Sequence, residues 1–130
     1  PRNAMGWEIH PPSLGGLLRW LHDDFGFPRY LITENGAAMP DTVRTADGRV
    51  DDQDRIDYVA DHLAQVHRSI EEGVPVEGYF VWSLLDNFEW AHGYGPRFGI
   101  VAVDPDTLER RPKASALWYR DVATSGVLAR

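Results

Sequence analysis

The chain of 130 residues contains no cysteine. This absence excludes disulfide bonds, thiolate metal sites and a cysteine nucleophile. It is typical of a cytoplasmic protein, which is the localisation that we expect. No apolar run approaches the length of about 18 residues that a transmembrane helix needs, and no signal peptide is recognisable. We therefore expect no membrane partner.

Positive charge is also scarce. Lysine and arginine number 13 against 20 aspartates and glutamates, so the formal net charge is −7. A protein that binds nucleic acid usually needs a basic face. The densest basic stretch, Arg110-Arg111 with Lys113, is short. The charge balance therefore argues against a nucleic-acid partner.

The usual signatures of metal and cofactor sites are missing. His62 and His67 stand five residues apart, whereas two zinc ligands on one helical face are spaced by four. The acidic stretch around Asp51 lacks the alternating pattern of a calcium loop. No serine lies in a Gly-x-Ser-x-Gly elbow, and the glycine-rich stretch 92–99 does not run from a strand into a helix. We expect no metal and no cofactor.

The amino-acid composition is typical of a globular protein. It is 43% hydrophobic and 25% charged, with five Trp, five Tyr and five Phe, which is too aromatic for a disordered chain. Its length suits one domain. The chain begins Pro1-Arg2-Asn3, with Met only at position 5. We interpret this start as that of a processed piece or an engineered segment.

The first half of the chain alternates between helix and strand signals. Leucines at helical spacing follow Pro11-Pro12, and Gly26 supplies a stop. The apolar run 30–33 predicts a short strand covered on both faces. A loop-like stretch comes next. A helix then begins with Asp51 or Asp52 as its cap and ends at Gly73.

The second half of the chain continues to alternate between strand and helix signals. The stretch 76–85 is rich in β-branched and aromatic residues and predicts a second buried strand. A loop with aromatics and glycines follows. A short β-excursion is expected around the Pro105-Asp106 turn, and Pro112 is expected to open a last helix. Alternation of this kind indicates parallel strands joined by crossovers, but two strands are too few for a closed α/β domain. We infer an α/β chain that forms part of a larger sheet.

Acidic and aromatic side chains gather where the two strands end. Glu34 follows the first strand, and Asn35-Gly36 predicts a sharp turn away from it. The second strand leads into Glu89 and Trp90. The carboxyl ends of parallel strands are where active sites of α/β folds form. Carboxylates beside aromatic rings suit a sugar, because the rings cover its C–H faces and the carboxylates accept from its hydroxyls.

Simpler interpretations exist for each residue. A glutamate after a strand is often a solvated loop residue or a helix cap. Trp82 within a buried strand is often part of the core, and Glu89-Trp90 can be an ordinary turn. The case for a site comes from their coincidence at two strand ends.

These residues lie in motifs that resemble a known family. The stretches YLITENG, GYFVWSLLDNFEWAHGYGPRFGIVAVD and RRPKASALWYRDV resemble glycoside hydrolase family 1, the β-glucosidases and their relatives. The resemblance covers essentially the whole chain. It implies the C-terminal portion of a (β/α)8 TIM barrel, about strands seven and eight with their helices. Residues 1–130 would then be a segment of a single barrel domain and not a complete domain.

The resemblance also implies roles for individual residues. Glu34, in Thr-Glu-Asn-Gly, matches the catalytic nucleophile. Trp82 matches the platform beneath the sugar, and Glu89 and Trp90 match the pair that hydrogen-bonds the sugar hydroxyls. Phe98 matches the aromatic residue near the exocyclic group of the sugar. An acidic residue at position 89 implies an unphosphorylated glycone, since a carboxylate would repel a phosphate.

The implied reaction is retaining hydrolysis of terminal non-reducing β-D-glucosyl residues, which needs a second carboxyl group as acid/base. The family takes that group from an Asn-Glu-Pro motif, which is absent here. Asp86 and Glu77 are the acids that could be given this role, without support from the family pattern. The expected partners are therefore a β-glycoside substrate and an N-terminal barrel segment that carries the acid/base glutamate. The alternative is a non-catalytic barrel fragment that acts as an association or sugar-binding module.

Overall fold

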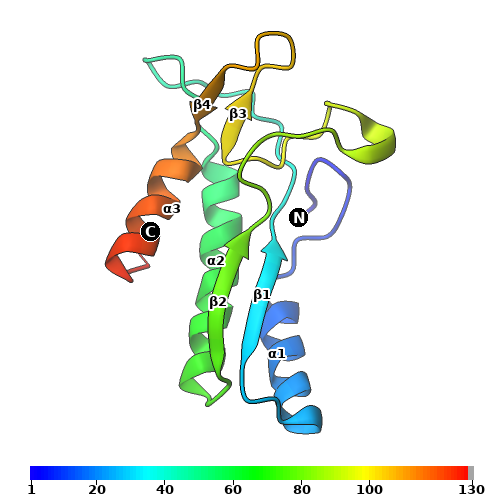
Figure 1. The fold of residues 1–130 in the computed structure, drawn as a ribbon, viewed down its shortest axis with the longest axis vertical. Helices are drawn as coiled ribbons and strands as arrows, with labels where there is room; N and C mark the ends of the chain where they lie inside the picture. Colours follow the sequence, from blue (N-terminus) through cyan, green and yellow to red (C-terminus); the bar gives the residue numbers. More distant parts are fainter. Residues whose placement is uncertain (129–130) are drawn as a thin grey trace.

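The computed structural model describes residues 1–128, in which helices and strands alternate as the sequence predicts (Figure 1). The first elements are α1 (Pro12–Phe25), β1 (Tyr30–Asn35), α2 (Gln53–Glu71) and β2 (Val76–Val81). They are followed by the short 3₁₀ helix η1 (Trp90–His92), β3 (Val101–Val103), β4 (Arg110–Pro112) and α3 (Ala114–Ser125). Within these residues, no helix is long and apolar enough to cross a membrane.

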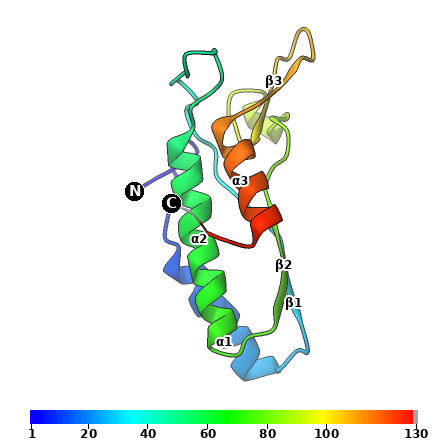
Figure 2. The same cartoon turned by 90° about the vertical axis from the view of Figure 1, so that its left-hand side faces the viewer.

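Strands β1 and β2 form a two-stranded parallel sheet, which confirms the parallel pairing expected from the element order. Tyr30 pairs with Val76, and Ile32 pairs with Tyr79. Helices α1 and α2 lie together on one face of this sheet, and the turned view shows no element on the opposite face (Figure 2). In residues 1–128 the sheet is open and does not close into a barrel.

The core lies between this sheet and its two helices. Leu18 of α1, Tyr30 of β1 and Val66 of α2 are buried together. Helix α1 begins with a proline in its first turn, whose fixed φ suits a helix start. It ends at Gly26, which adopts a left-handed conformation with φ 59°. The local signals read from the sequence therefore set the bounds of α1.

The other face of the sheet is uncovered in residues 1–128, so the predictions of a first strand covered on both faces and of a second buried strand are wrong for this chain. The exposed fractions are 55% for Leu31, 58% for Phe80 and 63% for Leu84. Alternate side chains of a strand point to opposite faces, and Leu31 and Phe80 point away from α1 and α2, while Leu84 follows the end of β2. Their apolar character made the strands look doubly buried, but the described residues contain nothing that packs on them.

Two element bounds differ from the prediction. Strand β2 ends at Val81 and not at residue 85, because the backbone N–H of Ser83 bonds to the carbonyl of Phe98 and no longer continues the ladder with β1. Helix α3 begins at Ala114, because Pro112 pairs with Val101 in the antiparallel β3–β4 hairpin. This hairpin is the β-excursion that the sequence predicts.

Candidate active site

Glu34 lies within β1, near its carboxyl end, with an exposed side chain. The next residue, Asn35, still belongs to the strand, so the predicted sharp turn at Asn35-Gly36 is wrong. The side-chain oxygen of Asn35 accepts a 2.6 Å hydrogen bond from the Tyr79 hydroxyl of β2. Burial raises the pKa of Tyr79, so this hydroxyl keeps its proton and its role as donor.

Gly36 brings the end of β1 against the end of β2. A Cβ atom at this position would lie 1.5 Å from the carbonyl oxygen of Trp82. The backbone N–H of Trp82 also donates a 3.0 Å hydrogen bond to the carbonyl of Asn35. Gly36 is therefore required for close approach and not for a turn. Through it, Glu34 and Trp82 come to the same edge of the sheet.

Trp82 directly follows the last residue of β2, and the Trp82-Ser83 peptide bond is cis. Its residue surface is 38% exposed, so within residues 1–128 it is not part of the core. The interpretation as a core tryptophan does not hold for the described residues, and the side chain is open to a ligand or to a further segment of protein.

The loop that carries Glu89 and Trp90 is closed at its base. The carboxylate of Asp86 accepts a 2.9 Å hydrogen bond from the backbone N–H of Gly99. A Cβ atom at Gly99 would lie 2.1 Å from the backbone nitrogen of Asp86, so only glycine permits this approach. The 86–99 loop therefore leaves from and returns to one fixed point beside the end of β2.

Within this loop Glu89 and Trp90 form a short turn. The backbone N–H of Glu89 donates a 2.8 Å hydrogen bond to the carbonyl of Gly93, and η1 follows at once. Trp90 adopts a φ of 44° and is 84% exposed. The side chain of Glu89 forms none of these bonds. The turn thus presents an indole ring and a carboxylate without using either side chain for its own closure.

Phe98 lies differently from the other four predicted site residues. It is 2% exposed, and its ring packs 6.1 Å from the ring of Trp7, centroid to centroid. The N-terminal arm that carries Trp7 bonds to the segment after β1, through Ala4 and Ala38. Phe98 therefore lies beneath the loop, covered by this arm, whereas Glu34, Trp82 and Trp90 reach the surface.

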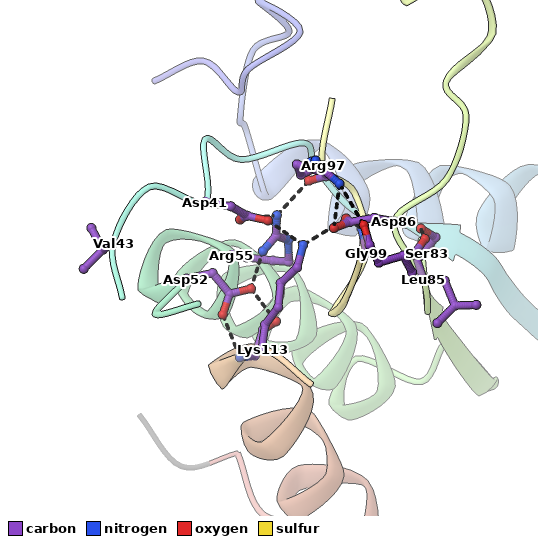
Figure 3. Close-up of polar contacts among 12 residues, drawn as sticks. Asp41, Val43, Asp52, Arg55, Ser83, Leu85, Asp86, Arg97, Gly99 and Lys113 are labelled. Atoms are coloured by element: carbon purple, nitrogen blue, oxygen red, sulfur yellow. Dashed lines mark hydrogen bonds and ion pairs between the residues drawn. The ribbon is translucent and has the colours of Figure 1, made fainter. Parts of the chain in front are cut away.

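A mostly buried group of charged side chains, which the sequence analysis missed, joins the segments that follow β1 and β2 (Figure 3). We call it the charge cluster; its members are Asp41, Asp52, Arg55, Asp86, Arg97 and Lys113. Three carboxylates thus face three cations, which satisfies the requirement that buried charges be paired. A signal was available in the sequence, since Lys113 is its only lysine and is preceded by a proline.

The cluster changes the interpretation of Asp52. Asp52 occupies the position before α2, but its side chain makes no capping bond there. Its carboxylate instead accepts bonds from the backbone N–H and the hydroxyl of Ser115, at 2.8 and 2.6 Å. Asp52 also pairs with Arg55. The predicted cap of α2 therefore caps the first turn of α3.

Neither of the acids considered for the acid/base role fits it. Asp86 is 8% exposed and pairs with Lys113 at 2.9 Å and with Arg97 at 3.6 Å, so its carboxylate is already occupied by two cations. Glu77 lies at the amino-terminal end of β2, opposite to the end that carries Glu34. Among residues 1–128, no group of three or more His, Asp or Glu side chains is placed to hold a metal ion.

Comparisons with known proteins show which family the chain resembles. The family model for glycosyl hydrolase family 1 matches residues 1–127. β-Glucosidase A of Thermotoga maritima is 52% identical over 128 residues, and a bifunctional β-D-glucosidase/β-D-fucosidase of Bifidobacterium breve is 50% identical over 123. These alignments cover 98% and 92% of this chain.

A solved structure of a family 1 β-glucosidase from Thermotoga maritima superposes on the whole chain with a TM-score of 0.95 and 52% identity. The chain spans 29% of that structure, and 28% and 27% of the two relatives by sequence. It therefore corresponds to little more than a quarter of the proteins it matches. The chain belongs to glycosyl hydrolase family 1.

Proposed function

We propose that this chain is the C-terminal portion, about strands seven and eight, of the (β/α)8 barrel of a retaining β-glycosidase. The enzyme would hydrolyse terminal non-reducing β-D-glucosyl residues, and this chain would supply the nucleophile and part of the glycone site. One observation carries the proposal: Glu34 and Trp82 meet at the carboxyl ends of two paired parallel strands, joined through Asn35 and Gly36.

In the proposed reaction the carboxylate of Glu34 attacks the anomeric carbon and forms a glycosyl–enzyme ester. The leaving group departs with a proton from a second carboxylic acid about 5–5.5 Å away, and water then hydrolyses the ester with that second group acting as base. Asp86 is committed to Lys113, and Glu77 lies at the far end of its strand. Because the Asn-Glu-Pro motif of the family is absent from this chain, we propose that the acid/base comes from the N-terminal barrel segment.

The proposed glycone site uses the exposed residues of the second strand end. The indole ring of Trp82 would cover the C–H face of the sugar ring. Glu89 and Trp90 would hydrogen-bond its hydroxyls through a carboxylate and an indole N–H. The carboxylate of Glu89 favours an unphosphorylated glycone. Phe98 stays a predicted contact to the exocyclic group, from a more buried position.

The uncovered face of the sheet supports the need for a partner. Leu31 of β1, Phe80 of β2 and Leu84 just beyond β2 are each more than half exposed, and large exposed apolar side chains at an uncovered sheet face suit an interaction site. The outer edges of β1 and β2 are also unpaired in residues 1–128, and such edges can pair with another chain. We propose that the N-terminal barrel segment covers this face. The alternative, an association or sugar-binding module, would cover it with a second copy or leave it bare.

The test combines this chain with the part of Thermotoga maritima β-glucosidase A that it does not match, as a mixture or a fusion; we call either product the assembled enzyme. Hydrolysis of an aryl β-glucoside is measured. We expect the isolated chain to hydrolyse it no faster than buffer, and the assembled enzyme to be active. An assembled enzyme with Glu34→Gln should be inactive. Turnover by the isolated chain that Glu34→Gln abolishes would contradict the need for a partner.

A second measurement separates the enzyme from the association module. Phe80→Glu places a charge on the uncovered face and should prevent assembly, as followed by mass in solution. Leu108→Glu is the matched control, since Leu108 is 59% exposed but lies in the β3–β4 turn. Assembly that proceeds normally but yields no activity would contradict the enzymatic proposal. Self-association of the isolated chain, blocked by Phe80→Glu, would support the alternative, as would glucose binding by calorimetry.

A further inference from the structure

We infer that Lys113 is a positioning residue for the glycone-binding loop, the 86–99 loop that carries Glu89 and Trp90. Lys113 precedes the first residue of α3, and its side chain is fully buried. Its ammonium group donates to the carboxylate of Asp86 at 2.9 Å and also to the carboxylate of Asp41 (Figure 3). The inference rests on the proposed function.

The two carboxylates belong to the segments that leave the two strands. Asp41 lies in the 36–52 segment, which follows Glu34 and β1. Asp86 lies at the outgoing end of the glycone-binding loop, three residues before Glu89. One ammonium group thus joins the segment after the proposed nucleophile to the start of the loop that would bind the sugar. Its position sets the separation of Glu34 from Glu89.

The returning end of the same loop has separate attachments. The backbone N–H of Met39 donates to the carbonyl of Arg97 at 3.1 Å, and Arg55 donates to the same carbonyl at 2.7 Å. Neither bond reaches Asp86. Arg97 also pairs with Asp86 at 3.6 Å, but it belongs to the loop itself. Lys113 is the side chain that bonds both Asp86 and a residue of the 36–52 segment, Asp41.

The site of Lys113 is built to hold it in one place. Its backbone N–H donates to the carbonyl of Ile100 at 2.9 Å, just past the loop, and the next residue donates to the carbonyl of Val50 at 3.0 Å. The backbone is thus anchored on both sides of the link that the side chain makes. The ammonium is buried between two carboxylates and is paired with both, so its removal would release Asp86 from Asp41.

The test uses the assembled enzyme with the double substitution Asp86→Asn/Lys113→Met. Lys113→Met alone would leave Asp86 as a buried carboxylate that has lost its closest cation, and such a variant can fail to fold. Together the two substitutions remove one charge of each sign, and the side-chain oxygen of Asn at position 86 can still accept from the N–H of Gly99. The double variant therefore keeps the base of the loop and removes the tie to Asp41.

Two readouts are expected to change. The KM for an aryl β-glucoside should rise about tenfold while kcat changes by less than about threefold, because the loop contributes binding of the glycone. Amide hydrogen exchange should become faster at Glu89, His92 and Gly93, and stay unchanged in α1. The matched control is Arg111→Met, since Arg111 pairs with Glu109 at the surface and lies two residues from Lys113. Both readouts should be unchanged in this control.

The outcomes separate this inference from the proposed function. If the wild-type assembled enzyme is inactive, the proposed function fails and the exchange measurement alone decides the role of Lys113. Unchanged KM and unchanged exchange in the 86–99 loop of the double variant would overturn the inference. Faster exchange throughout the protein, α1 included, would also overturn it, because Lys113 would then support the fold in general and not the loop.

Discussion

The backbone N–H of Trp82 donates a 3.0 Å hydrogen bond to the carbonyl oxygen of Asn35, the residue that follows Glu34. The proposed nucleophile and the proposed sugar platform are thus joined by main-chain atoms of adjacent strands. Their separation depends on strand pairing and not on flexible side chains, which is the rigid support that a catalytic constellation requires.

Gly36→Ala tests this junction. The added methyl group would overlap the carbonyl oxygen of Trp82, since the Cβ position lies 1.5 Å from it. We expect the assembled enzyme to lose about 1–3 kcal/mol of unfolding free energy, as overpacked positions do, and to lose activity as the strand ends separate. Thermal unfolding and hydrolysis of an aryl β-glucoside measure the two effects.

The control for Gly36 is Gly16→Ala in the interior of α1, where no atom lies within 4 Å of the added carbon. Alanine in a helix interior is favoured over glycine by up to about 1 kcal/mol, so this variant should be as stable as the parent or more so. Equal stability of Gly36→Ala and the parent would contradict the close contact between the strand ends.

Much of the fold could be predicted because its elements carry local signals. The stop at Gly26, the leucine spacing of α1 and the apolar stripe of α2 each depend on residues a few positions apart. The parallel pairing of β1 and β2 followed from the element order. Exposure could not be predicted in this way. Apolar residues such as Phe80 look buried in the sequence, and whether they are depends on whether another part of the protein covers them.

The candidate site was predicted only in part for a related reason. Glu34, Trp82 and Trp90 stand at strand ends and in motifs, which a sequence displays directly. The charge cluster joins residues from four separate segments, such as Asp41 and Lys113, and no periodicity links them. Asp52 was predicted to cap α2, which follows it directly in the sequence, whereas its side chain caps α3. Long-range ion pairs of this kind leave no local signal in the sequence, apart from the fact that Lys113 is its single lysine.

Glu89→Gln tests the proposed glycone contact without disturbing the turn. The turn is closed by backbone bonds to Gly93 and His92, so the fold should be unchanged. Loss of a hydrogen bond to a charged group costs about 1.5–3 kcal/mol, which corresponds to a fall of roughly tenfold to a hundredfold in kcat/KM. Glu71→Gln, at the exposed end of α2, is the control. Unchanged kcat/KM in Glu89→Gln would exclude the contact.

Because His62 is buried, we expect the protein to lose stability in mild acid. The residue is 5% exposed. Its Nδ1 atom lies 2.7 Å from the carbonyl oxygen of Tyr58, and its ring lies against the Tyr58 ring. Burial lowers the pKa of His62 in the folded state. The unfolded chain therefore binds a proton first, near its ordinary pKa of about 6.5. The contribution of neutral His62 is complete above this pH and is lost as pH falls through the lower folded value.

The measurement is the free energy of unfolding of the assembled enzyme by denaturant, between pH 7.5 and 5. His62→Gln should flatten the fall that begins near pH 6.5. His67→Gln is the matched control on the same helix, because the side chain of His67 is 66% exposed. The same pH dependence in the parent and in His62→Gln would contradict burial of a neutral imidazole.

The most direct test of the account identifies the residue that bonds to the sugar. The assembled enzyme is incubated with an activated 2-deoxy-2-fluoro-β-glucoside, whose fluorine slows hydrolysis of the glycosyl–enzyme ester, and its peptides are analysed by mass spectrometry. The account predicts one fluoroglucosyl adduct on the peptide that contains Glu34, absent from Glu34→Gln. An active assembled enzyme whose adduct forms on any other residue would contradict it.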